Sequence, residues 1–200
     1  MFITFEGIDG SGKSTQIKKL KEKLEQKGAQ VETFRDPGGP IVSEKIREIL
    51  LNPDYDIDVV TELLLFSAAR SQLMAENVLP NLEKGRVVIL DRFYDSTTAY
   101  QGHGRQSIPL DEIHKMNRIA SHKCEPDLTI YMKVPLEEAK KRMAKQKDRM
   151  EQAGDPFFEK VIKGFNHLAE NEDRFVTVDA TRPSDQVHNQ IWQFVEKQFQ

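Results

Sequence analysis

The stretch FEGIDGSGKST near the start of the chain restricts the possible folds more than any other feature of the sequence. It matches the pattern G-x-x-x-x-G-K-[ST] with Gly7, Gly12, Lys13 and Ser14. In this pattern a glycine-rich turn joins a strand to the N-terminus of a helix, and its backbone N–H groups surround a phosphate. Apolar residues before the turn and helical spacing after it fit this mechanism, so we interpret residues 7–14 as a phosphate-binding loop.

Short apolar runs alternate with amphipathic stretches along the rest of the chain. After a first strand at 2–6, Ile17, Leu20 and Leu24 share one face of a helix that ends at Gly28. Further strands are predicted at 30–35, 86–91, 128–132 and 175–178. Further helical regions are predicted at 57–84, 137–145, 156–170 and 184–199. This alternation predicts an α/β fold with a five-stranded parallel sheet and helices on both faces.

Length and composition limit the class of protein. The 200 residues suit one domain over residues 1–200. A single cysteine, Cys124, leaves no internal disulfide and suits a reducing compartment, so we expect a cytoplasmic protein. No apolar stretch approaches the ~18 residues of a membrane span. The net charge of −3 argues against a broad nucleic-acid surface.

Charged residues follow three of the predicted strands. The first strand ends in the phosphate loop, the second in RDPGG at 35–39, and the third in Asp91 and Arg92. The carboxyl ends of parallel strands meet at one edge of a sheet, where ligands bind in folds of this class. Lys13 is suited to bind phosphates, and Ser14 and Asp91 are candidate Mg²⁺ ligands. Without the loop, an aspartate at a strand end would more often be a turn residue.

Two kinds of protein carry such a loop on a parallel sheet. A switch GTPase would have N-K-x-D and D-x-x-G motifs, and the sequence has neither in the expected places. A small-molecule kinase needs a cationic pocket for an acceptor and an arginine-bearing lid. Arg35, Arg70 and Arg92 supply cations, and Phe66 lies one helical turn before Arg70 on the same face. The residues favour a kinase.

With these residues in view, the sequence resembles a known family, the thymidylate kinases, which phosphorylate dTMP with ATP. The resemblance covers nearly the whole chain and is carried by FEGIDGSGKST at 5–15, RDPGG at 35–39, SAAR at 67–70, DRFYDSTTAYQG at 91–102, PDLTIYM at 126–132 and DRMEQ at 148–152. It implies the P-loop nucleoside monophosphate kinase fold, a Mg²⁺ cofactor, a homodimer, and transfer of the γ-phosphoryl group of ATP to dTMP.

The resemblance also implies roles for individual residues. The implied ATP-binding residues are Gly7, Asp9, Gly10, Ser11, Gly12, Lys13, Ser14, Thr15 and Arg142. The implied dTMP-binding residues are Asp9, Arg35, Phe66, Arg70, Arg92, Thr97, Tyr100 and Gln101. In this second set the arginines hold the phosphate and Phe66 stacks on thymine. Tyr100 lies under the deoxyribose, and Thr97 and Gln101 lie near the base. Asp9 accepts a hydrogen bond from the 3′-hydroxyl of dTMP.

A lid is expected at about residues 142–153. Family members carry a catalytic arginine either in the phosphate loop or in the lid, and this loop has Gly10 and Ser11 instead, as in bacterial members with the arginine in the lid. Arg142 and Arg149 are the candidates, and DRMEQ favours the second. The implied catalytic residues are Lys13, Asp91, Arg92 and Arg149. Asp36 replaces the glutamate of many members, which leaves its role open.

Two other functions stay open at this point. One is a kinase for another nucleotide or a deoxynucleoside, although a nucleoside would not require three converging arginines. The other is a nucleotide-binding regulator without turnover, although such a protein would typically have lost Lys13, Asp91 or the lid arginine.

Overall fold

A computed structural model describes residues 1–143 and 148–198 of the chain. The strands are β1 (Phe2–Glu6), β2 (Val31–Arg35), β3 (Val87–Asp91), β4 (Leu128–Lys133) and β5 (Phe175–Asp179). The α-helices are α1 (Lys13–Gln26), α2 (Ile41–Leu51), α3 (Val59–Leu73), α4 (Leu79–Glu83), α5 (Tyr94–Thr97), α6 (Leu110–Ala120), α7 (Leu136–Arg142), α8 (Asp155–Asn171) and α9 (Ser184–Gln198). Two π-helical segments, η1 (Met74–Val78) and η2 (Thr98–Gly104), and the 3₁₀-helix η3 (Glu151–Ala153) complete these elements.

The five strands form one parallel sheet in the order β2-β3-β1-β4-β5. Asp91 at the end of β3 pairs in register with Phe5 of β1 on one side and with Arg35 of β2 on the other. The register therefore brings the phosphate loop, the residues after Arg35 and the residues after Asp91 to the same edge of the sheet. The predicted five-stranded parallel sheet is confirmed.

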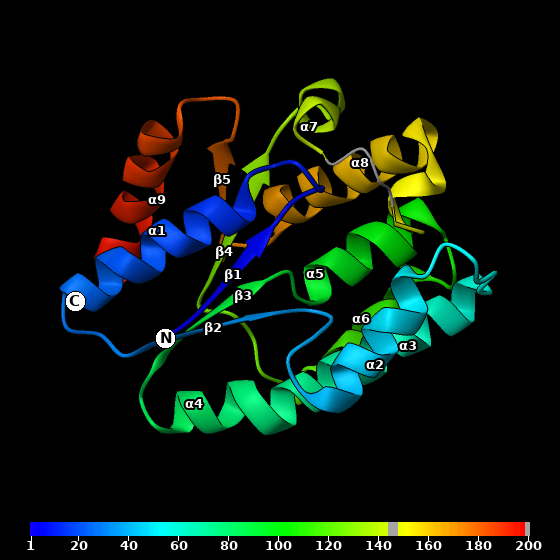
Figure 1. Cartoon of the computed structure of the whole chain (residues 1–200), viewed down its shortest axis with the longest axis horizontal. Helices are drawn as coiled ribbons and strands as arrows, with labels where there is room; N and C mark the ends of the chain where they lie inside the picture. Colours follow the sequence, from blue (N-terminus) through cyan, green and yellow to red (C-terminus); the bar gives the residue numbers. More distant parts are fainter. Residues whose placement is uncertain (144–147, 199–200) are drawn as a thin grey trace.

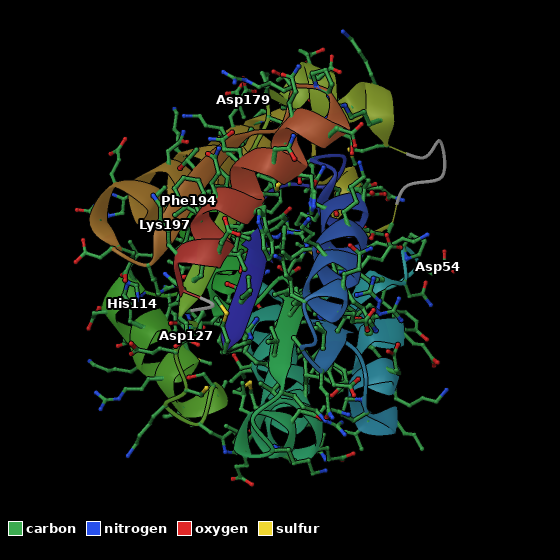
Figure 2. The ribbon with its side chains drawn as sticks, turned by 90° about the vertical axis from the view of Figure 1, so that its left-hand side faces the viewer. Asp54, His114, Asp127, Asp179, Phe194 and Lys197 are labelled. Carbon is green, nitrogen blue, oxygen red and sulfur yellow. The ribbon has the colours of Figure 1, made fainter. Side chains whose placement is uncertain are left out.

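Helices cover the sheet on both sides (Figure 1). α1 and α9 pack against each other, and the figure shows them side by side, with the remaining long helices across the sheet from them. Figure 2 separates the two ends of the sheet: Asp127 precedes β4 at the lower end, and Asp179 ends β5 at the upper end. The loops that follow the strands thus gather at the upper end in this view.

For the elements that were predicted, the boundaries agree with the structure to within a few residues. The helical region predicted at 57–84 is continuous through α3, η1 and α4, and it begins after Asp58, whose carboxylate accepts hydrogen bonds from the N–H groups of Val60 and Thr61. The helices α2 and α6 were not predicted. Residues 144–147 of the predicted lid lie outside the described residues. Among the helices of the described ranges, none is both long and apolar enough to cross a membrane.

Close packing of α8 against η2 fixes the segment that follows β3. The Tyr100 ring lies edge-on to Phe157, Phe158 and Phe165, with ring centroids 5.9, 6.4 and 6.2 Å apart. Gly104 permits this approach, because a Cβ there would lie 2.6 Å from the Phe157 ring. The aromatic cluster thus holds η2, and with it Tyr100, in place after β3 and α5.

A buried carboxylate holds the turn between β3 and α5. Glu6, the last residue of β1, is 0% exposed; its two oxygens accept hydrogen bonds from the Phe93 N–H at 2.8 Å and the Ser96 hydroxyl at 2.6 Å. Burial, reinforced by the nearby Asp95, raises the pKa of Glu6 to about 8. The side chain is therefore protonated in the folded protein at neutral pH, while it is ionised in the unfolded chain.

This difference predicts a pH dependence of stability. Between pH 4.5, the ordinary pKa of the group, and about 8, the folded state binds a proton that the unfolded chain releases. The free energy of unfolding should therefore fall as pH rises through this window, by at most about 1.4 kcal/mol per pH unit for this group. Urea unfolding at pH 5 to 8 measures this slope. Glu6→Gln should remove this contribution, and Glu22→Gln on the exposed face of α1 should retain it. Equal slopes for wild type and Glu6→Gln would contradict the assignment.

Candidate active site

The phosphate loop connects β1 to the first turn of α1. Gly7, Gly10 and Gly12 all have positive φ angles, at 138°, 76° and 89°. Gly10 also approaches α7 closely, since a Cβ on it would lie 2.3 Å from the carbonyl oxygen of Ala139. A side chain at this position would displace the loop, so both its backbone conformation and its surroundings require glycine.

Lys13 is held by the loop that it belongs to. Its ammonium group donates to the carbonyl oxygens of Gly7 at 3.0 Å and Ile8 at 3.1 Å, and the residue is buried. Burial, reinforced by Arg92, lowers the pKa of Lys13. The ammonium group thus lies beside the N-terminus of α1, where the helix dipole also attracts anions.

An open cavity of about 1140 Å³ lies over this loop, and we call it the phosphate cavity. Among the residues that line it are Lys13, Ser14, Thr15, Arg35, Asp91 and Arg142. The Ser14 hydroxyl donates to the Asp91 carboxylate at 3.3 Å. A hydroxyl and a carboxylate are hard oxygen ligands that suit Mg²⁺. No group of three or more His, Cys, Asp or Glu side chains suited to a metal occurs among the described residues, so a cation here would depend on few protein ligands.

Of the other loop residues implied for ATP, Gly10 and Gly12 also line the phosphate cavity. Ser11 is buried and lines a neighbouring cavity of about 630 Å³. That cavity extends past Thr15 and Arg142 to Ala180, which follows β5. The space beside the loop is therefore extended enough to continue from a phosphate site towards the loop after the last strand.

Arg92 bridges the phosphate loop and the segment after β3. It has a positive φ of 70°, and its guanidinium donates to the Gly7 carbonyl at 2.7 Å and to the Asp9 carboxylate at 2.8 Å. Burial alone would raise the pKa of Asp9, but Arg92 and Lys13 lower it to about 2. Burial likewise opposes the charge on Arg92, yet Asp9 and other carboxylates keep the pKa of Arg92 well above its usual value. Both side chains are charged.

A second cavity of about 530 Å³, the acceptor cavity, lies beside the first. Phe66 and Arg70 line it from α3, while Thr97, Tyr100 and Gln101 line it from α5 and η2. Asp9 and Arg92 line it as well, so seven of the eight residues implied for dTMP lie around one space. The arginines and the aromatic rings give this space a cationic part and an apolar part.

The acceptor cavity contains polar atoms without protein partners. Arg70 is 2% exposed and donates through Nε to Asp36, whose side chain is also buried. Among the described residues that line this cavity, four buried polar atoms have no hydrogen-bond partner: Nη1 of Arg70, Oδ1 of Asp36, Oγ1 of Thr97 and the hydroxyl oxygen of Tyr100. Buried polar atoms are nearly always satisfied in proteins, so these four favour a polar ligand in the cavity.

The two cavities share part of their walls. Asp9, Asp36, Arg47 and Arg92 line both of them. A molecule in one cavity therefore lies beside the same charged groups as a molecule in the other. This arrangement can place two anionic ligands next to each other across a common set of arginines.

Of the remaining predicted arginines, two line the phosphate cavity and one lines neither cavity. Arg35 lines the phosphate cavity, where its guanidinium pairs with Glu44 at 2.9 Å, and it does not line the acceptor cavity. Arg142 lines the phosphate cavity and donates to the Ala180 carbonyl at 2.9 Å. Arg149 lines neither cavity, because its guanidinium pairs with Glu62 at 2.7 Å and donates to the Leu50 carbonyl at 2.7 Å. Its catalytic role stays a prediction.

Several residues of the site were not anticipated. Arg47 of α2 lines both cavities and donates to the Pro37 carbonyl at 2.9 Å. Glu62 and Glu6 are buried carboxylates that hold residues of the cavity walls. The helical spacing of apolar residues from 41 to 51 could have identified α2 and Arg47, whereas nothing in the local sequence marks the two glutamates as buried.

Comparison with known proteins identifies the family of this chain. A family model described as thymidylate kinase matches residues 5–191. A thymidylate kinase of Chlorobaculum parvum is 47% identical, over 96% of this chain and 93% of its own length. Those of Thermosipho melanesiensis and Thermosipho africanus are 43% and 44% identical, over 98% and 100% of both chains. Since the match includes the phosphate loop, both cavities and the sheet that positions them, the chain belongs to the thymidylate kinase family.

Proposed function

We propose that the chain transfers the γ-phosphoryl group of ATP to dTMP, giving dTDP and ADP, with ATP in the phosphate cavity and dTMP in the acceptor cavity. The observation that carries this proposal is the shared wall, in which Asp9, Arg47 and Arg92 line both cavities. Phosphoryl transfer requires two polyanions to be held in line, and a common set of arginines between two adjacent cavities suits that task.

On the ATP side, the loop backbone and Lys13 bind the β- and γ-phosphates. Ser14 and Asp91 would hold Mg²⁺, directly or through water, and their oxygen atoms fit that ion. When bound there, the ion would supply positive charge against the phosphates. The adjacent cavity, which Arg142 and Ala180 line, accommodates the nucleoside part of ATP.

On the dTMP side, Arg70 and Arg92 hold the phosphate, and Arg35 and Arg47 add positive charge nearby. Phe66 offers a ring for stacking on thymine, and the buried Tyr100 closes the floor under the sugar. The attacking oxygen belongs to a phosphate that is ionised at neutral pH, so the chain needs no general base. Its residues act by orienting the two substrates and by stabilising the charge of the transition state.

Production of ADP from ATP and Mg²⁺ tests this function against a panel of acceptors. The panel contains dTMP, dUMP, dCMP, dGMP, dAMP and the nucleoside thymidine. We expect the highest kcat/KM for dTMP and no turnover of thymidine, because the arginines bind a phosphate. An equal or higher kcat/KM for another acceptor would contradict the proposal.

Arg142 provides a specific test of the ATP side. It lines both parts of the proposed ATP site and is anchored by Glu138 and the Ala180 carbonyl. Arg142→Ala should raise KM for ATP about tenfold, the effect of losing one charge-assisted contact, and leave KM for dTMP unchanged. Steady-state kinetics with each substrate varied in turn measure both constants. Lys141→Ala, an exposed neighbour on α7, should behave as wild type. An effect on KM for dTMP alone would contradict the assignment.

We include a homodimer in the proposal. Ile41, Val42 and Ile49 of α2 and Leu64 of α3 are large apolar side chains between 43% and 81% exposed, and these two helices pack against each other. An apolar patch of this kind marks an interaction surface. Sedimentation equilibrium should give the mass of two chains for wild type and of one chain for Leu64→Asp. If wild type at micromolar concentration has the mass of one chain, that result would contradict the proposed homodimer.

A cytoplasmic location stays a prediction, supported by Cys124 being the single cysteine of the sequence.

A further inference from the structure

Glu62 is a buried carboxylate with no part in the proposed mechanism. It lies in α3, is 1% exposed, and is not among the residues that line the acceptor cavity. We propose that Glu62 is a positioning residue that sets the base preference of the acceptor cavity by fixing the orientation of the Gln101 side-chain amide. The inference rests on the proposed function, because it concerns the base of the acceptor nucleotide.

Two side chains donate hydrogen bonds to this carboxylate, and a third forms an ion pair with it. The Gln101 amide nitrogen lies 2.9 Å from Oε1 of Glu62, and the Arg105 Nε lies 3.3 Å from the same oxygen. Nη1 of Arg149 lies 2.7 Å from Oε2. Two guanidinium groups therefore accompany the single amide, and both can only donate hydrogen bonds.

The orientation of the Gln101 amide follows from this donor set. An ion-paired carboxylate offers only hydrogen-bond acceptors, so the NH₂ group of Gln101 must face Glu62. The amide oxygen of Gln101 must then lie on the side of the amide that faces away from Glu62. Gln101 is 2% exposed and lines the acceptor cavity, whereas Glu62 does not. The amide oxygen is thus directed to the cavity, and no donor from the described residues reaches it. Turning the amide over would place the Gln101 amide oxygen against a Glu62 carboxylate oxygen and break the charge-assisted hydrogen bond between the two side chains.

A hydrogen-bond acceptor held in a fixed position discriminates between pyrimidine bases. Thymine and uracil carry a hydrogen-bond donor at N3, whereas N3 of cytosine is an acceptor. The Gln101 oxygen therefore accepts from N3–H of thymine or uracil and opposes the lone pair of cytosine. A site built around a substrate N–H rejects analogues that lack it much more strongly than an apolar pocket rejects a missing methyl group.

Glu62→Gln is the variant that should reverse this orientation. The oxygen of the introduced amide would take the position of Oε2, beside Nη1 of Arg149 at 2.7 Å and Nη2 of Arg105 at 3.4 Å, because these groups only donate. The introduced NH₂ group would then take the position of Oε1 and face Gln101, at the expense of the longer 3.3 Å contact from Nε of Arg105. Gln101 would turn its own amide to accept from that group, which presents the NH₂ of Gln101 to the cavity. A donor at this position accepts cytosine N3 and opposes thymine N3–H.

The measurement is kcat/KM for dTMP, dUMP and dCMP with each variant. For Glu62→Gln we expect the dTMP-to-dCMP ratio to fall at least tenfold, while the dTMP-to-dUMP ratio stays within twofold of wild type, since both bases have N3–H. Glu62→Asp retains a carboxylate, which only accepts hydrogen bonds. Its dTMP-to-dCMP and dTMP-to-dUMP ratios should therefore equal those of wild type even where the absolute rates fall. A loss of packing alone would lower all three values together, and that result would overturn the inference.

A measurement on wild type remains informative even where Glu62→Gln folds poorly, and a double variant shows whether Glu62 acts through Gln101. The wild-type enzyme should discriminate strongly against N3-methyl-dTMP, and equal turnover of this compound and dTMP would overturn the inference. In a Gln101→Met background, Glu62→Gln should cause no further change in the dTMP-to-dCMP ratio. A further change there would mean that Glu62 does not act through Gln101. Failure of wild type to use dTMP would instead contradict the proposed function itself.

Discussion

The ion pair between Arg92 and Asp9 is the interaction on which the rest of the site depends. Arg92 follows the last residue of β3 in a left-handed conformation, with φ of 70°, and its guanidinium contacts Gly7, Asp9 and Ser96. A non-glycine residue in this conformation is strained, and the surrounding contacts must hold it there. The pair fixes the phosphate loop relative to the segment that carries the acceptor cavity, so the two cavities keep one geometry.

The sheet explains why so many charges can gather at this place. Parallel pairing of β1, β2 and β3 brings their carboxyl ends together, and each end carries polar residues. The arginines around the cavities are matched by carboxylates: Asp36 pairs with Arg70, Glu44 with Arg35, and Asp9 with Arg92. These pairs position the guanidinium groups before substrates bind, which reduces the reorganisation needed in the transition state.

The sequence predicted the parts of this site that local patterns determine. The phosphate loop, the ends of β1 to β3 and the Phe66–Arg70 face follow from motif and periodicity. The position of Arg149 could not be predicted, because its partner Glu62 lies in a helix far earlier in the sequence, and long-range ion pairs leave no local pattern. Arg47 was missed for a different reason: it lies in α2, which directly follows the turn-forming stretch DPGGP. The burial of Glu6 and Glu62 depends on tertiary packing, which overrides the usual exposure of glutamate.

Replacement of Asp9 separates its contact with dTMP from its role in the loop, because its carboxylate lies on the wall between the two cavities. Isothermal titration of Asp9→Ala, with dTMP and a non-hydrolysable ATP analogue measured separately, compares the two ligands. We expect Kd to rise for both ligands, because the ion pair holds the phosphate loop, and to rise about tenfold more for dTMP than for the ATP analogue, as expected for a lost hydrogen bond to a charged group. Equal losses for both ligands would contradict this account and leave Asp9 with a role in loop structure alone.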